Sequence, residues 1–162
     1  MNAQELTHWK SQIFAYQQRA RENQGPQQTA LFDVTPAYCD LDAIDLFTLT
    51  QQSMAFWRFP AQKFGSACLY FVIDATMPLL LYVGETCQSN LRWKGVHDCK
   101  RYIERYQELH YKYGLTAAVN IAFWWDAPVE ARPRQRLELA LIEKWRAPFN
   151  KQNWTIWARP FD

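Results

Sequence analysis

The sequence predicts an α+β fold, a small three-stranded antiparallel sheet flanked by helices, with an N-terminal helical and irregular arm packed on it. Two short runs rich in aromatic and branched residues, 68–74 and 79–83, are separated by four residues, which is typical of a hairpin. A third run of this kind, 117–125, follows a long helical segment, and a further helical pattern covers 134–146. The expected order is therefore strand, strand, helix, strand, helix.

Residues 1–64 are expected to form the arm, and residues 65–162 the compact domain. A helix is expected over residues 4–23, because apolar side chains recur there at helical spacing: Leu6, Trp9, Ile13, Tyr16 and Ala20. The rest of the arm is too apolar for a disordered tail and too irregular for a regular element. We expect Trp57 and Phe59 to be buried against the domain.

The hairpin is followed by an unusual connection. The first strand, CLYFVID, and the second, LLLYV, are joined by the turn ATMP, and the second strand stops at Gly84. A polar loop then leads into a basic helix that begins near Ser89 or Asn90, both favourable N-cap residues. A plain hairpin would return as a strand after two to five residues. A loop of this kind is therefore a candidate for functional residues on a rigid scaffold.

The remaining elements have recognisable ends. The basic helix is expected to run towards Tyr113 and to end at Gly114, a suitable C-cap residue. The run AAVNIAFWW predicts the third strand. Apolar residues share one face of the last helix, which Pro148 ends: Leu137, Ala140, Leu141 and Trp145.

Charge is concentrated in two segments. The net charge of +2 is too small for a polyelectrolyte, so a nucleic-acid surface would have to be a local patch. Residues 92–112 carry six basic and three acidic side chains, or +3, and residues 132–151 carry six and two, or +4. The arm, at −1 over residues 1–64, is a poor candidate for binding DNA. The two basic helices favour contact with phosphates if they share a face, although solvated helices are also rich in Lys and Arg.

Cysteine usage predicts a cytoplasmic protein with reduced thiols. The four cysteines form no CxxC pair, and no apolar run approaches the length needed to span a membrane, so no membrane partner is expected. The alternative is a zinc site that combines His97 and Cys99 with two distant cysteines. It lacks the usual ligand spacing of such sites.

Four pieces of the domain, in order, resemble a GIY-YIG nuclease domain. They are Tyr70 within CLYFV, LYVG at 81–84, Arg92 eight residues after Gly84, and LELALIEKWRAPFN at 137–150. The resemblance covers about residues 65–153 and has no counterpart for the arm. It implies a metal-dependent endonuclease, a hydrolase that acts on phosphodiester bonds of DNA with Mg²⁺ or Mn²⁺ as cofactor.

The resemblance also implies a role for each matching residue. Tyr70 is the expected general base and Tyr82 its partner at the scissile phosphate, while Arg92 is the electrostatic clamp. Glu138 is the expected metal ligand, because the family pattern places a branched apolar residue four positions on, here Ile142, and an asparagine twelve on. That asparagine, Asn150, helps to order the site in the family. Glu143 is the rival carboxylate but lacks these spacings.

These residue types suit the chemistry independently of the resemblance. Phosphodiester cleavage needs an activated water and stabilisation of charge at the phosphate and the leaving oxygen. An Arg fork matches phosphate oxygens, and Mg²⁺ usually keeps several waters beside one or two carboxylates. Gly84 is expected to let the backbone and the substrate come close. Lys94 and Lys100 are further expected phosphate contacts.

Two positions depart from the family pattern. Cys68 stands where the first glycine is expected, which requires only a small residue. The family often has a histidine four residues after the arginine, but here Val96 takes that place and His97 comes one step later, a rotation of about 100° on a helix. His97 is therefore either a proton carrier or a surface histidine.

The alternative function is a non-catalytic module on the same scaffold that binds nucleic acid or a protein. The four matching residues favour the enzyme. The modest charge and the lack of a separate DNA-binding domain favour the module, or an enzyme that a protein partner directs to its substrate. RNA stays open as a substrate.

Overall fold

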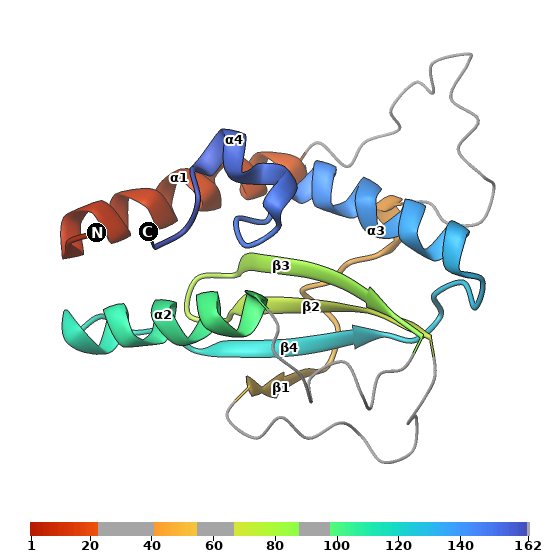
Figure 1. The fold of residues 1–162 in the computed structure, drawn as a ribbon, viewed down its shortest axis with the longest axis horizontal. Coiled ribbons are helices and arrows are strands. Elements are labelled where there is room, and N and C mark those ends of the chain that lie inside the picture. The colour runs from red at the N-terminus through yellow and green to blue at the C-terminus, as the bar shows by residue number, and fades with distance from the viewer. Residues whose placement is uncertain (23–40, 55–66, 88–97, 162) are drawn as a thin grey trace.

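The computed structural model describes residues 1–22, 41–54, 67–87 and 98–161 (Figure 1). The strands β1 to β4 form one antiparallel sheet in the order β1-β4-β2-β3. The elements in chain order are α1 (Ala3–Glu22), η1 (Leu41–Ala43), β1 (Gln51–Ser53), β2 (Cys68–Asp74), β3 (Leu79–Thr86), α2 (Asp98–Lys112), β4 (Val119–Trp124), α3 (Ala131–Trp145), η4 (Lys151–Asn153) and α4 (Trp154–Trp157). The predicted α+β class is confirmed.

In the part of the chain that the structure describes, the sheet has four strands, which corrects the prediction of three. The additional strand, β1, comes from the arm and pairs with β4 from Gln51↔Ala122 to Ser53↔Asn120. Its sequence, QQS, has neither β-branched residues nor alternation. A short edge strand can form with such residues, because it needs little more than backbone pairing on one side. Helix α4 and the two 3-10 turns are likewise short and were not predicted.

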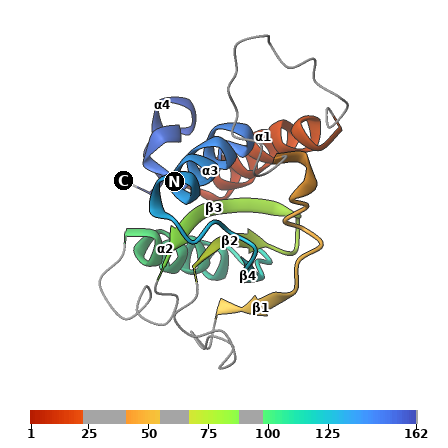
Figure 2. The same ribbon diagram turned by 90° about the vertical axis from the view of Figure 1, so that its right-hand side faces the viewer.

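Side chains pack on both faces of the sheet, in two clusters. The α2-side core contains residues of α1, α2 and one face of β2, among them Leu6, Ile13, Tyr70, Val72 and Tyr106. The α3-side core contains α3 and the other face of β2, among them Phe71, Ile73, Leu137, Leu141 and Trp145. Figure 2, a view along the strands, shows α1 and α3 at the β3 edge of the sheet and β1 at the opposite edge.

Helix α1 belongs to the same fold as the domain. Leu6 and Ile13 have no exposed surface, and the Trp9 ring stacks on Phe149 with centroids 6.4 Å apart. The predicted helix over residues 4–23 is confirmed, whereas Trp57 and Phe59 lie outside the described residues. The helix is therefore a covering layer of the sheet rather than a loose extension.

Among the described residues, the outer edge of β3 pairs with no further strand and instead receives hydrogen bonds from α1 and from the segment after α3. The Gln17 amide donates to the Leu80 carbonyl at 2.9 Å and accepts from the Leu80 N–H at 2.8 Å. Next along the edge, the Phe149 N–H donates to the Leu81 carbonyl at 2.9 Å. An edge strand otherwise presents unpaired backbone groups, so α1 and the segment after α3 protect this one.

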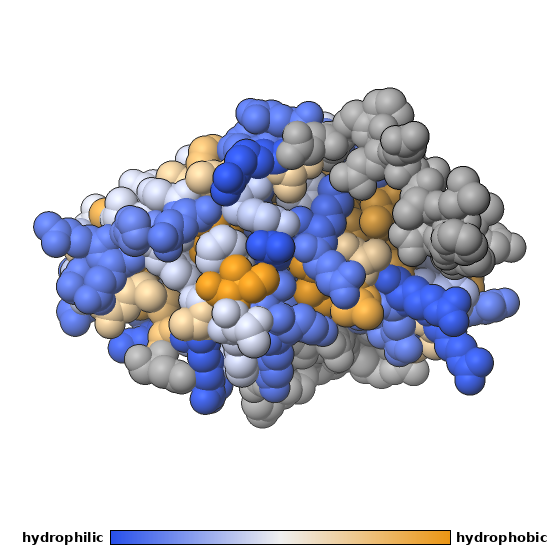
Figure 3. Space-filling view, turned by 90° about the horizontal axis from the view of Figure 1, so that it is seen from above, coloured by the Kyte–Doolittle hydropathy of each residue, from blue (hydrophilic) through white to orange (hydrophobic). Residues whose placement is uncertain are grey.

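The surface above the helices is mainly hydrophilic. Figure 3 looks down on α1, α3 and α4 and shows charged and polar side chains interrupted by small hydrophobic patches. Leu139 of α3 and Ile156 of α4 are exposed. Scattered apolar side chains of this kind are ordinary on a globular surface. In the described part of the chain, no helix has both the length and the apolar character needed to cross a membrane.

Candidate functional site

A bulge in β3 places the two predicted tyrosines on one face of the sheet. The pairing changes from Val72↔Tyr82 to Ile73↔Leu80, so Leu81 is an additional residue in β3. In a regular strand Tyr82 and Leu80 would share a face. Because of the bulge, Leu80 packs in the α3-side core while Tyr82 packs against the α2-side core, where Tyr70 lies.

The two tyrosine rings are neighbours. Their centroids are 5.9 Å apart, with an angle of 31° between the ring planes. The Tyr70 side chain has no exposed surface, whereas Tyr82 is half-buried. The structure thus brings two phenol groups from adjacent strands together, as the site prediction requires, and leaves Tyr82 the more accessible of the two.

Gly84 makes room for the Tyr70 ring. It lies directly opposite Tyr70 in the β2–β3 register. A Cβ atom at Gly84 would lie 2.2 Å from Tyr70 Cζ and 2.3 Å from its hydroxyl oxygen, distances that no real contact shows. From the sequence, the space beside Gly84 is expected to admit the substrate, whereas in the structure the Tyr70 ring occupies it. The glycine therefore acts by positioning Tyr70.

Asn150 holds β3 between Tyr82 and Gly84. Its Oδ1 accepts from the Val83 N–H at 3.0 Å, and its Nδ2 donates to the Val83 carbonyl at 2.8 Å. The side chain is buried, so these two bonds are shielded from water. This is a direct physical means by which the predicted site-ordering asparagine can order the strand that carries Tyr82.

Helix α3 is fixed to the end of β3 by an ion pair between the buried Arg134 and the partly buried Glu85. Arg134, which is 2% exposed, donates through Nε to Glu85 Oε2 at 2.5 Å. Its Nη1 donates to the carbonyl oxygens of Pro128 at 2.9 Å and Val129 at 2.7 Å. In the structure, the charge of Glu85 is paired with Arg134.

Glu138 lies one helical turn after Arg134, on a helix that packs along β3. It is half-buried, while the rival Glu143 is exposed. Sequence reasoning missed Arg134 as a positioning residue, because an arginine at the start of a basic helix gives no sign that it will be buried.

Three predicted site residues, Arg92, Lys94 and His97, lie outside the described residues. Lys100 lies in the first turn of α2 and is half-buried. The convergence of Arg92 with Glu138 and the tyrosines therefore stays a prediction.

The chemistry of Glu138 fits a hydrated divalent metal ion. Within residues 1–22, 41–54, 67–87 and 98–161, no three His, Cys, Asp or Glu side chains gather as a metal site. A carboxylate that shares Mg²⁺ or Mn²⁺ with water molecules needs no such cage, since Mg²⁺ commonly uses one or two carboxylates.

Cys68 is a packing residue at the position of the missing glycine. Burial raises the pKa of its thiol to about 12, although the positive charge of Arg134 partly opposes the shift. The thiol is therefore neutral near pH 7 and has little nucleophilic character. A small uncharged side chain is all that this position needs.

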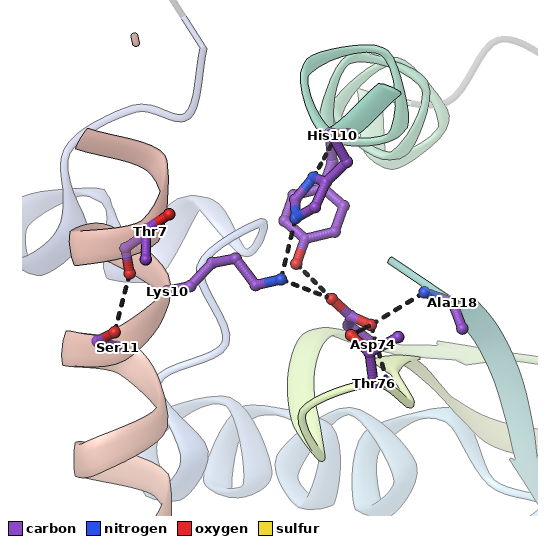
Figure 4. A network of polar contacts seen from close by, with 8 residues as sticks. Thr7, Lys10, Ser11, Asp74, Thr76, His110 and Ala118 are labelled. Atoms are coloured by element: carbon purple, nitrogen blue, oxygen red, sulfur yellow. Dashed lines mark hydrogen bonds and ion pairs between the residues drawn. The ribbon is translucent and has the colours of Figure 1, made fainter. Parts of the chain in front are cut away.

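A second cluster of ionisable groups joins α1 to the sheet and to α2 (Figure 4). Lys10 Nζ lies 3.0 Å from Asp74 Oδ2 and 2.9 Å from His110 Nε2. The Tyr106 hydroxyl donates to Asp74 Oδ2 at 2.7 Å, and the Ala118 N–H donates to Oδ1 at 3.1 Å. All four side chains are buried, so the cluster is a polar clasp inside the α2-side core.

The clasp favours one set of protonation states. Burial alone would raise the pKa of Asp74, but hydrogen bonds from Tyr106, Thr76 and Ala118, with the charge of Lys10, lower it to about 2. Burial and Lys10 lower the pKa of His110. Its Nδ1 faces the Tyr106 carbonyl at 2.7 Å, so a neutral ring donates there and accepts from Lys10 at Nε2. Protonating His110 would set two cations against each other.

Comparisons of the chain with protein-family models, with curated proteins and with solved structures return no match. The interpretation of the site therefore depends on its own residues and on their arrangement around the β2–β3 hairpin.

Proposed function

We propose that the chain is a metal-dependent endonuclease that hydrolyses phosphodiester bonds in DNA. The observation that supports this best is the arrangement of the hairpin, in which Tyr70 and Tyr82 lie ring to ring on one face. Gly84 leaves space for the first tyrosine, and Asn150 holds the strand of the second.

In this proposal the two tyrosines act on the attacking water and the scissile phosphate. Tyr70 is the general base that takes a proton from the water, and Tyr82 donates a hydrogen bond at the phosphate. Arg92 holds phosphate oxygens with its planar fork and stabilises the negative charge that develops there. Glu138 would hold a divalent metal ion, and the ion, when bound, would supply Lewis-acid stabilisation of the negative charge that develops in the transition state. We place the activity in the cytoplasm, with a protein partner directing the enzyme to its substrate.

One observation favours the second candidate, a non-catalytic module that binds nucleic acid. Tyr70 has no exposed surface. A general base must come within hydrogen-bond distance of the proton that it accepts. An enzyme would therefore have to open around Tyr70 when the substrate binds, whereas a binding module needs no such movement.

A cleavage panel with a matched pair of tyrosine variants tests the proposal. Duplex, branched and single-stranded DNA, and RNA of the same sequences, are incubated with Mg²⁺, Mn²⁺ or EDTA. We expect cleavage of at least one DNA substrate with metal and none in EDTA. Tyr82→Phe should lower the rate about 10²- to 10³-fold, the usual cost of removing one hydrogen-bond donor to the transition state.

The control is Tyr111→Phe, because Tyr111 is 90% exposed on α2. This variant should cleave like the wild type. A wild-type protein that binds DNA but cuts no substrate would support the module, and full activity in EDTA would contradict the role of the metal.

A further inference from the structure

A cationic pocket lies between α2 and the C-terminal segment, apart from the hairpin site. Its volume is about 210 Å³, and three of its lining residues are arginines: Arg101, Tyr102, Arg105, Arg159, Pro160 and Phe161. Arg101 and Arg105 are four residues apart on α2 and therefore project from one side of that helix. Arg159 comes from a segment more than fifty residues later in the chain. Three guanidinium groups from two elements thus share one small cavity.

The walls of the pocket are anchored in the α2-side core. Tyr102 is 3% exposed and contacts the rings of Phe149 and Trp154, at centroid distances of 5.8 and 5.9 Å. Phe161 packs against Trp9 at 5.8 Å and against Phe149 at 5.9 Å. The C-terminal segment is therefore held against α1 and α2 by aromatic contacts, although no helix or strand continues there.

The backbone around Arg159 is strained. Ala158 has φ 62° and ψ 170°, and Phe161 has φ 61°, values that favour glycine. Such conformations cost roughly 1–3 kcal/mol each and are concentrated at functional sites. The packing of Phe161 holds the turn closed, and the turn presents Arg159 to the pocket.

Aromatic rings also orient two of the guanidinium groups. Arg159 Cζ lies 5.5 Å from the centroid of the Trp154 ring, and Arg101 Cζ lies 5.4 Å from that of Tyr102. A guanidinium held in this way loses less side-chain freedom when it binds an anion. The pocket is therefore partly organised for a ligand.

The charges of the pocket call for an anion with several oxygens. The ion pair between Arg105 and Glu108, at 3.0 Å, involves side chains that are 56% and 64% exposed, so water and salt weaken it. Arginine forks bind phosphate oxygens in pairs, and three forks match one phosphate better than one carboxylate. The aromatic walls suit the sugar or base attached to that phosphate.

We propose that this pocket binds a backbone phosphate of the nucleic-acid strand, away from the phosphate that is cleaved. The inference rests on the proposed function, in which Lys100 of α2 is an expected phosphate contact. A strand that lies along α2 past Lys100 would also reach Arg101 and Arg105 in the pocket. The pocket then contributes to affinity and register, and the hairpin site to chemistry.

Equilibrium binding tests the inference without requiring cleavage. Fluorescent duplex, branched and single-stranded DNAs are each titrated with protein in Ca²⁺ at several salt concentrations. We expect Arg101→Gln and Arg159→Gln each to weaken binding about 3- to 10-fold, and the double variant about 10- to 100-fold. The double variant should lower the slope of log K against log salt by about 2, because each lost phosphate contact removes about one.

The matched control is Arg19→Gln, which removes one exposed arginine on α1 outside the pocket. Its affinity for DNA should be within about twofold of that of the wild type, because a charge far from the bound strand contributes only a screened interaction. If the double variant binds no more weakly than this control, or if the wild type does not bind DNA, the pocket has no such role. Thermal melting confirms that each variant is folded, and Arg101→Lys, which keeps the charge, should lose less affinity than Arg101→Gln.

Different experimental outcomes would overturn this inference and the proposed function. A protein that cuts DNA while the double variant binds and cuts like Arg19→Gln would overturn the pocket alone. A protein that binds through the pocket but cuts nothing would overturn the nuclease function and leave the pocket in place. In an active protein, the double variant should raise KM and leave kcat nearly unchanged.

Discussion

Replacing Gly84 with alanine should destabilise the fold and displace Tyr70 at the same time. The new Cβ would lie 2.2 Å from Tyr70 Cζ, more than 1 Å short of an ordinary contact, and the ring is fully buried. Gly84 has no left-handed φ, so the backbone itself accepts alanine and the cost is steric. Overpacking a core by one methyl group costs typically 1–3 kcal/mol, and this overlap with a ring that has nowhere to turn should cost about 3 kcal/mol.

Urea unfolding and thermal melting measure this cost. In a domain of this size, about 3 kcal/mol corresponds to a decrease in Tm of roughly 6–12 °C. Gly114→Ala is the matched control, because its φ of +63° strains alanine while no atom lies within 4 Å of the new Cβ. It should cost about 1–2 kcal/mol through the backbone alone. The double variant Gly84→Ala/Tyr70→Ala should be more stable than the sum of the single variants predicts, because the clash is gone. A Gly84→Ala protein with wild-type Tm would refute the packing of Tyr70 against this glycine.

Three further predictions test the buried polar contacts that hold the edge strand β3 and helix α1. Asn150→Ala should cost about 2–4 kcal/mol in urea unfolding, because it leaves both backbone groups of Val83 buried without their partner; a loss below 0.5 kcal/mol would contradict that role. Lys10→Met should cost about 3 kcal/mol, because the Asp74 carboxylate stays buried without its cation, and an unchanged unfolding free energy would show that the ion pair contributes nothing. Because the pKa of His110 is lowered on folding, the unfolded chain binds more protons below pH 6.5, and the unfolding free energy should fall as the pH drops from 7.5 to 5. In His110→Gln the unfolding free energy should depend less on pH. An equal pH dependence in the variant and the wild type would contradict the role of His110.

The sheet was predictable where local sequence determines it. In the hairpin, two runs of strand-forming residues, CLYFVID and LLLYV, are separated by one clear turn. Strand β2 has the predicted bounds, Cys68–Asp74. Strand β3 continues to Thr86, beyond the predicted end, because Gly84 pairs opposite Tyr70 instead of ending the strand. A glycine usually reads as a strand end. Only the register shows that it accommodates the ring across from it.

The features missed from the sequence depend on contacts between distant segments. Strand β1 forms because β4 offers a free edge, which its own residues, QQS, do not reveal. The bulge at Leu81 decides the face on which Tyr82 lies, yet LLLYV reads as one continuous apolar run. The buried Lys10 and Gln17 lie on a helix that the spacing of apolar residues predicted well, and their partners are more than sixty residues away. Polar residues at such spacing are ordinarily assigned to the solvent face.

For the candidate site, the sequence suggests residue types but not the contacts that position them. Tyr70, Tyr82 and Asn150 were chosen through a resemblance, and the structure gives the last of them a specific contact with Val83. The burial of Arg134 and its ion pair with Glu85 could not be foreseen, because both residues look like surface charges in the sequence. Burial of a charge depends on the tertiary partner that compensates it.

Single-turnover cleavage by Glu138→Gln, with Glu143→Gln as its control, tests the central proposal most directly. Both changes remove one negative charge from α3 with little change in size, but Glu138 is half-buried beside β3 while Glu143 is exposed. If Glu138 holds the metal ion, its variant should cleave several orders of magnitude more slowly, because the metal supplies several kcal/mol of transition-state stabilisation. Its Tm and its DNA binding in Ca²⁺ should stay near those of the wild type, and Glu143→Gln should cleave normally. Equal cleavage by wild type and Glu138→Gln would contradict the assignment of this carboxylate. If only Glu143→Gln lost cleavage activity, Glu143 would be the metal ligand instead.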